Sequence, residues 1–162
     1  MRQKLIILAL LASAPGAAHA SDSLGVFGPW GAFRDPAVPR CYAITEPLRT
    51  TAGGANWKAF AAVGTWPKRG LRSQLHVRLS RARAAKSTVY LSIGDRRFAL
   101  VSGDADAWAQ DARMDAAIVA AMRSTDTMSV EGRAANGRRF SDLYVLKGAA
   151  TAMDAAALGC AR

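Results

Sequence analysis

Residue types that build active sites and metal sites are scarce in this 162-residue chain. It contains two histidines, two cysteines and two glutamates. It has no Cys-x-x-Cys, Gly-x-Ser-x-Gly or Ser-x-x-Lys motif, so the signatures of redox thiols and common serine hydrolases are missing. The glutamates, Glu46 and Glu131, lie far apart in the sequence, and no pattern places them in one cleft for glycoside hydrolysis. The sequence therefore predicts a protein that is not an enzyme and uses no cofactor.

The chain also lacks an apolar run near the roughly 20 residues needed to span a bilayer. Its first apolar run, Leu5–Ala12, follows a positively charged start and precedes Ala18-His19-Ala20, a small-x-small pattern that signal peptidase recognises. We expect residues 1–20 to be a signal peptide cleaved after Ala20. Residues 21–162 then form a single periplasmic or secreted domain without a transmembrane segment.

The two cysteines, Cys41 and Cys160, stand near the two ends of this domain. In an oxidising compartment an isolated pair most often forms one disulfide. A catalytic or metal-binding thiol has little support, because His76 is the only histidine after residue 20. We therefore predict a disulfide between Cys41 and Cys160 and no metal site.

Positive charge is abundant. Removing Arg2 and Lys4 from the 22 lysines and arginines leaves 20 against 12 acidic residues, a net charge of +8. Such a surface favours anionic envelope components over nucleic acid in this compartment, although it also serves solubility. The candidate anion-binding patch, here called the basic segment, comprises Lys68, Arg69, Arg72, Arg78, Arg81, Arg83 and Lys86. We expect it at one end of a sheet; the alternative is a solvated strand face that discourages aggregation.

Short alternating segments separated by turns predict a mainly β fold, and the clearest alternation places Leu75, Val77 and Leu79 on one buried face. A two-residue turn at Gly94-Asp95 predicts a hairpin with Leu91 opposite Phe98.

A second hairpin is predicted around Asn136-Gly137. A two-residue turn there places Val130 opposite Leu143 and Met128 opposite Val145. Helices are expected at 112–123, capped by Asp111, and at 149–158. The pattern suggests an antiparallel β-sandwich or open barrel with one or two short helices.

Four aspartates between Asp104 and Asp115 form an alternative site, either for a cation or for an envelope hydrolase. They are Asp104, Asp106, Asp111 and Asp115. An EF-hand loop starting at Asp104 fails at two key positions, the fifth and the sixth. Helix capping and a first-turn carboxylate explain the last two aspartates without a ligand. His76, on the polar side of its predicted strand, is expected to be an ordinary surface residue.

Four segments resemble the invasion-associated locus B family of exported proteobacterial proteins. They are Val26–Phe33 with Cys41–Ile44, the hairpin Val89–Leu100, the helix Asp115–Met122, and the ending Tyr144–Met153, which is similar to a closing Leu-x-Gly-x-x-x-Ala motif. The resemblance implies an immunoglobulin-like β-sandwich without catalytic residues, and contacts with envelope or host proteins. Some pathogenic members have a role in host-cell entry. The chain departs from the family by lacking a cysteine pair just before the helix.

Overall fold

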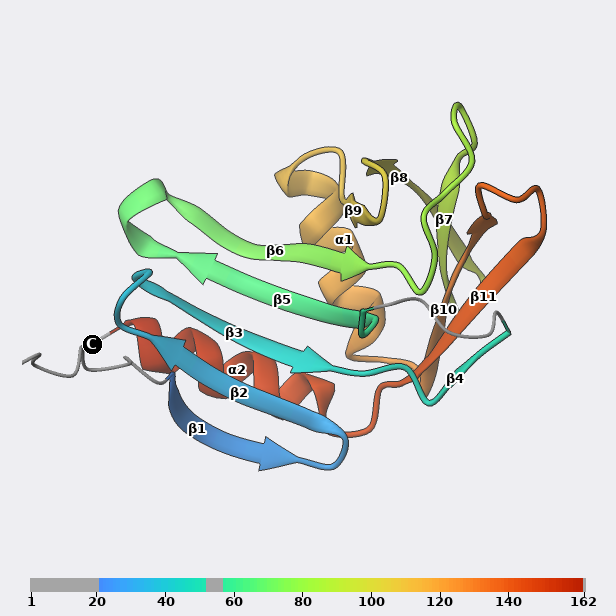
Figure 1. Ribbon diagram of the computed structural model, residues 1–162. Coiled ribbons are helices and arrows are strands. Elements are labelled where there is room, and N and C mark those ends of the chain that lie inside the picture. The colour runs from blue at the N-terminus through green and yellow to red at the C-terminus, as the bar shows by residue number, and fades with distance from the viewer. Residues whose placement is uncertain (1–20, 52–56, 162) are drawn as a thin grey trace, which may run out of the picture.

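The computed structural model describes residues 21–51 and 57–161. The predicted signal peptide lies outside the described residues. The elements are β1 (Asp22–Phe27), β2 (Trp30–Asp35), β3 (Arg40–Thr45), β4 (Arg49–Thr50), β5 (Phe60–Trp66), the 3-10 helix η1 (Pro67–Arg69), β6 (Leu71–Arg78), β7 (Val89–Ile93), β8 (Arg96–Ser102), β9 (Asp106–Trp108), α1 (Ala112–Met122), β10 (Thr127–Arg133), β11 (Arg139–Val145) and α2 (Ala149–Cys160) (Figure 1).

The strands form one antiparallel sheet in the order β1-β2-β3-β5-β6-β9-β8-β7-β10-β11-β4. The short strand β9 joins two halves, because it pairs with β6 on one side and β8 on the other. We call β1, β2, β3, β5 and β6 the first half, and β8, β7, β10, β11 and β4 the second half. The two halves are steeply inclined to each other (Figure 1). The predicted fold class, mainly antiparallel β and sandwich-like with two short helices, is confirmed.

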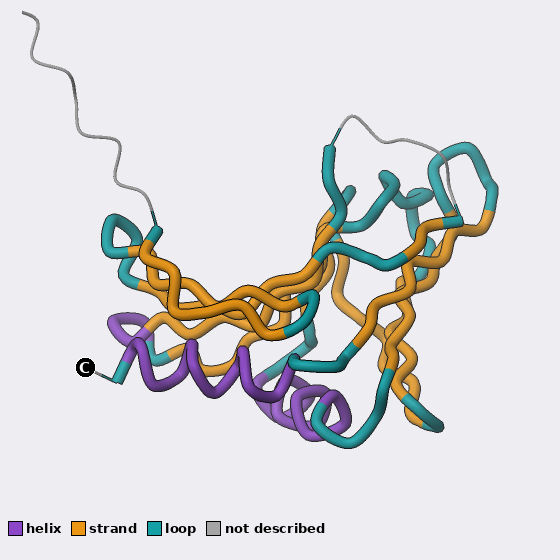
Figure 2. Tube along the Cα trace, turned by 90° about the horizontal axis from the view of Figure 1, so that it is seen from below, coloured by secondary structure: helices purple, strands orange, loops and turns teal. Residues whose placement is uncertain are grey.

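The core lies between this bent sheet and the two helices. Helix α2 packs against β1, β2, β3 and β5, and α1 packs against β6, β7 and β8. Figure 2 shows both helices on the same side of the first half. Leu75 and Val77 on β6 and Leu79 just after it are fully buried, which confirms the predicted alternation. Neither helix of the described chain has the length and apolar character needed to cross a membrane.

The predicted disulfide is present. Cys41 on β3 is bonded to Cys160, the last residue of α2, across 119 residues of sequence. Cys41 is fully buried beneath the helix. The cross-link therefore attaches the C-terminal helix to the middle of the first half of the sheet.

Two local predictions are confirmed. In the β7–β8 hairpin, Leu91 pairs with Phe98 and Val89 with Leu100. Helix α1 begins after Asp111, whose side chain accepts a hydrogen bond from the backbone N–H of Met114 at 2.8 Å. Both features depend on contacts between residues close in sequence, so a local sequence pattern predicts them well.

The predicted register of the second hairpin is wrong by one residue. Val130 pairs with Asp142 and Met128 with Tyr144. The loop contains three residues, since the carbonyl of Ala134 accepts the N–H of Gly137 at 2.8 Å and Gly137 has φ +81°. A turn followed by a left-handed glycine is the usual geometry of a three-residue loop.

This register turns different side chains of β11 toward the core. Phe140, Asp142 and Tyr144 are buried, whereas Leu143 and Val145 are only partly buried. The backbone N–H of Ser80 donates to Asp142 at 3.0 Å, so this buried carboxylate is held by a main-chain group. Burial raises the pKa of Asp142, against the hydrogen bond that lowers it.

Candidate functional site: a basic groove on the second half of the sheet

The structure does not bring the basic segment together at one end of the sheet. Lys68 and Arg69 lie in η1 and Arg72 at the start of β6, whereas the other four side chains lie at or beyond the end of that strand. Strand β6 separates Arg72 of the first group from Arg78 of the second by roughly 20 Å. The seven residues therefore cannot act as one compact patch.

Two of these arginines serve the fold. The guanidinium of Arg83 donates to four backbone carbonyls, those of Gly103, Ala84, Ser87 and Ser102, at 2.6–3.1 Å. Arg78 donates to Asp106 Oδ2 at 2.6 Å. Their guanidinium hydrogen bonds hold loops and strands in place.

The aspartates of the alternative site are also dispersed. Asp106 pairs with Arg78 across β6 and β9, Asp111 caps α1, and Asp115 is buried and accepts the N–H of Leu75 at 2.8 Å. Burial raises the pKa of Asp115. Within residues 21–51 and 57–161, no three His, Cys, Asp or Glu side chains are grouped to hold a metal ion.

His76 is more than an ordinary surface residue. Its Nε2 lies 2.9 Å from Asp106 Oδ1, its ring stacks on Trp108 at 5.3 Å between centroids, and Phe60 meets it edge-on at 5.1 Å. A histidine–aspartate pair acts in hydrolysis when the histidine activates a nucleophile. In the described part of the chain no hydroxyl or thiol is hydrogen-bonded to His76. The pair instead joins β6 to β9 across the bend of the sheet.

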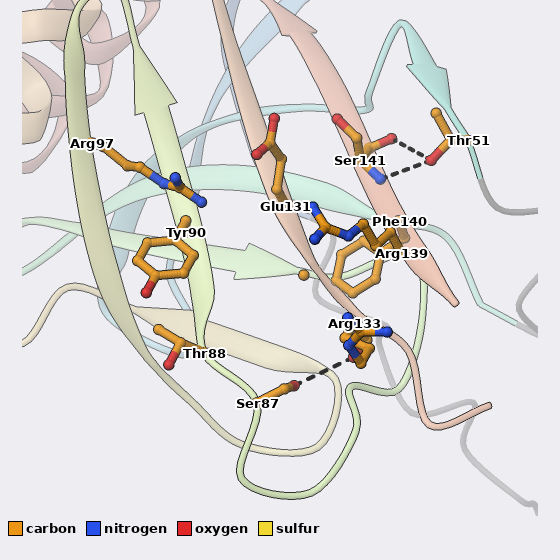
Figure 3. A pocket seen from close by; sticks show the side chains of 11 residues that line it. Thr51, Ser87, Thr88, Tyr90, Arg97, Glu131, Arg133, Arg139, Phe140 and Ser141 are labelled. Carbon is orange, nitrogen blue, oxygen red and sulfur yellow. Dashed lines mark hydrogen bonds between the residues drawn. The ribbon is translucent and has the colours of Figure 1, made fainter. Parts of the chain in front are cut away.

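A groove of about 750 Å³ opens on the second half of the sheet. Its lining residues come from β7, β8, β10 and β11, from Ser87 and Thr88 just before β7, and from Thr51 just after β4 (Figure 3). The residues that determine its chemistry are Tyr90, Arg97, Glu131, Arg133, Arg139 and Ser141. We refer to this feature as the basic groove. Its volume lies in the range of about 300–1,000 Å³ that is common for ligand sites.

Two of the three arginines of the basic groove are adjacent, and none of the three forms an ion pair within the described residues. Arg133 and Arg139 are directly opposite each other on β10 and β11. Arg97 lies over the ring of Tyr90, with its guanidinium carbon 4.0 Å from the ring centroid. No ion pair joins any of the three to a carboxylate within the described residues. Since like charges directly opposite destabilise a sheet, this arrangement favours binding of an anion.

Glu131 is the one acidic side chain among the described residues that line the basic groove. It lies on β10, opposite Tyr90 on one side and Ser141 on the other. The hydroxyl of Ser129 donates to its Oε1 at 3.2 Å. The groove therefore has positive groups on both sides of a central carboxylate, as Figure 3 shows.

Hydrogen bonds at the rim hold the groove in shape. Nη1 of Arg133 donates to the carbonyl of Gly137 at 2.7 Å, so the three-residue loop positions this arginine. At the other edge the N–H of Ser141 donates to Thr51 Oγ1 at 2.8 Å. Both contacts depend on the observed hairpin register.

Sequence reasoning missed the basic groove because it grouped charges that are close along the chain. The predicted two-residue turn placed Arg133 opposite Phe140 and so put Arg139 on the other face. A usable signal was present: Arg133 and Arg139 are placed symmetrically about a three-residue loop centred on Asn136. Arg97 has no such signal, since β8 is distant from β11 in the sequence.

The fold and the groove define a disulfide-bonded, mainly antiparallel β protein with an open basic groove on one sheet face. Comparison with protein-family models, curated proteins and solved structures finds no match to this chain. The resemblance to the invasion-associated locus B family stays a prediction from the sequence.

Proposed function

We propose that this protein is an exported, non-enzymatic protein of the bacterial cell envelope that binds an anionic ligand in the basic groove. The observation that carries the proposal is the presence in one groove of three arginines that form no ion pair within the described residues. A role of the invasion-associated locus B type, in contact with envelope or host components, agrees with this proposal.

The proposed location rests on two features. Residues 1–20 have the composition of a signal peptide, and the disulfide between Cys41 and Cys160 is a bond that persists in oxidising compartments. The periplasm and the extracellular medium both meet this condition. Anionic lipids, lipopolysaccharide and acidic glycans are abundant there, and they match the charge of the groove.

Electrostatics and geometry both support an anionic ligand. Guanidinium groups form paired hydrogen bonds with carboxylate, phosphate or sulfate oxygens, and these charge-assisted bonds are stronger than neutral ones. Bringing Arg133 and Arg139 together costs energy that a bound anion offsets. The groove is open, so a segment of a longer polymer fits as well as a small molecule.

The test is binding of the purified protein to polyphosphate and to vesicles with anionic or neutral headgroups, over a series of salt concentrations. We expect binding to the anionic probes that weakens as salt screens the charges. Arg139→Gln should weaken it about tenfold, the effect of losing one charge-assisted contact. The matched control is Arg69→Gln, which removes the same charge from the exposed η1 and should change little. Equal effects of the two variants would show that only net charge matters.

A further inference from the structure

We propose that the ligand of the basic groove is an acidic saccharide, a sugar chain with anionic groups at two separated positions. This inference rests on the proposed function and names the ligand class for the same groove. It follows from the order of charges across the strands β7, β10 and β11.

Positive side chains of the groove lie on both sides of strand β10. The guanidinium of Arg97 is held over Tyr90 on β7, and Arg139 stands on β11. Strand β10 lies between these two strands, so their backbones are about 10 Å apart, two inter-strand spacings. Glu131 on β10 is opposite Tyr90, and the opposed pair Arg133 and Arg139 lies two residues further along, so Glu131 stands between Arg97 and that pair. The groove is therefore suited to two anionic groups, one on each side of Glu131.

Between the two anionic groups, the ligand passes over the carboxylate of Glu131. A carboxylate only accepts hydrogen bonds, and within the described residues Glu131 receives one, from Ser129. A ligand that displaces water from this half-buried carboxylate binds better if it presents a donor, such as a hydroxyl. Phosphate chains and the acyl parts of lipids have no donor to offer. Sugar rings have hydroxyls, and uronic acids or sulfated sugars add the anionic groups.

The other side chains that line the groove are hydroxyl-bearing or aromatic. Thr88 and Ser141 add hydroxyl-bearing side chains to the groove, and Tyr90 adds an aromatic ring beside Arg97. A sugar ring has both polar hydroxyls and apolar C–H faces, so it matches this mixture. Glu131 is thus the specificity residue that separates a saccharide from other polyanions.

The experiment measures affinity of the full chain for oligogalacturonates from monomer to hexamer, for uncharged galacto-oligosaccharides, and for polyphosphate. We expect oligogalacturonates long enough to reach both arginines to bind at least tenfold more tightly than the monomer. Arg97→Gln and Arg139→Gln should each remove about tenfold of this gain. Arg69→Gln is the control of equal charge, and thermal melting verifies that every variant is folded.

The decisive variant is Glu131→Gln. If a sugar hydroxyl donates to this carboxylate, the variant weakens oligogalacturonate binding about tenfold and strengthens polyphosphate binding, because a negative charge is gone. Tighter binding of both probes would overturn the saccharide proposal while leaving an anion-binding function in place. If neither probe binds at low salt, both proposals fail.

Discussion

The disulfide should supply a large part of the stability of this protein. Replacing Cys41 and Cys160 with alanine removes a cross-link between residues 119 positions apart. In the chain-entropy model, closing a loop of this length stabilises the folded state by about 5 kcal/mol. The total free energy of unfolding of a natural domain is about 5–15 kcal/mol. We therefore expect the double variant to unfold at a much lower urea concentration.

Packing adds a smaller effect that a control can separate. Cys41 is fully buried between β3 and α2, so Cys41→Ala also removes a buried sulfur. Urea unfolding of the wild-type protein with and without a reductant changes only the cross-link. The difference between the reduced protein and the double variant then measures the lost packing.

A loss below about 1 kcal/mol on reduction, with an unchanged dependence on urea, would refute the reasoning. It would mean that the packing of α2 against β1, β2, β3 and β5 stabilises the helix position without the disulfide.

Two further predictions concern stability. Burial raises the pKa of Asp142 above 3.8, so the contribution of this group to stability is present below that value and is lost as pH rises through the raised pKa. Asp142→Asn keeps an acceptor for the N–H of Ser80 but does not ionise. In urea unfolding, the stability of this variant relative to wild type should therefore increase from pH 4 to pH 7. A difference that stays constant with pH would contradict a raised pKa of Asp142. Gly137→Ala forces a side chain into φ +81° and should cost about 1 kcal/mol, measured by melting. Gly103→Ala, where a Cβ meets no atom closer than 3.8 Å, is the control and should change stability by no more than about 0.5 kcal/mol.

Local patterns in the sequence determined much of the fold. The alternation of Leu75, Val77 and Leu79 identified a half-buried strand, and Asp111 marked the start of α1. The turn at Gly94-Asp95 fixed the pairing of Leu91 with Phe98. These features rest on hydrogen bonds and side-chain periodicity within a few residues, so no knowledge of the rest of the chain is needed.

Longer irregular segments were less informative. The stretch before Cys41 has glycine and proline among its aromatic residues and no clear alternation, but it forms the β1–β2 hairpin. Residues 103–111 contain β9, which joins the two halves of the sheet. A strand of three residues has too little periodicity to be recognised, and only its neighbours β6 and β8 stabilise it.

The candidate site was decided mainly by the tertiary structure. Asn136-Gly137 is compatible with a two-residue or a three-residue loop, and this choice of one residue determines which side chains of β11 face outward. Pairing of β7 with β10 then brings Arg97 toward Arg133 and Arg139 from a distant part of the chain. The basic segment shows the reverse case, since an extended strand separates charges that are neighbours in sequence. Composition alone gives the net positive charge, and only the pairing of strands determines which arginines share one groove.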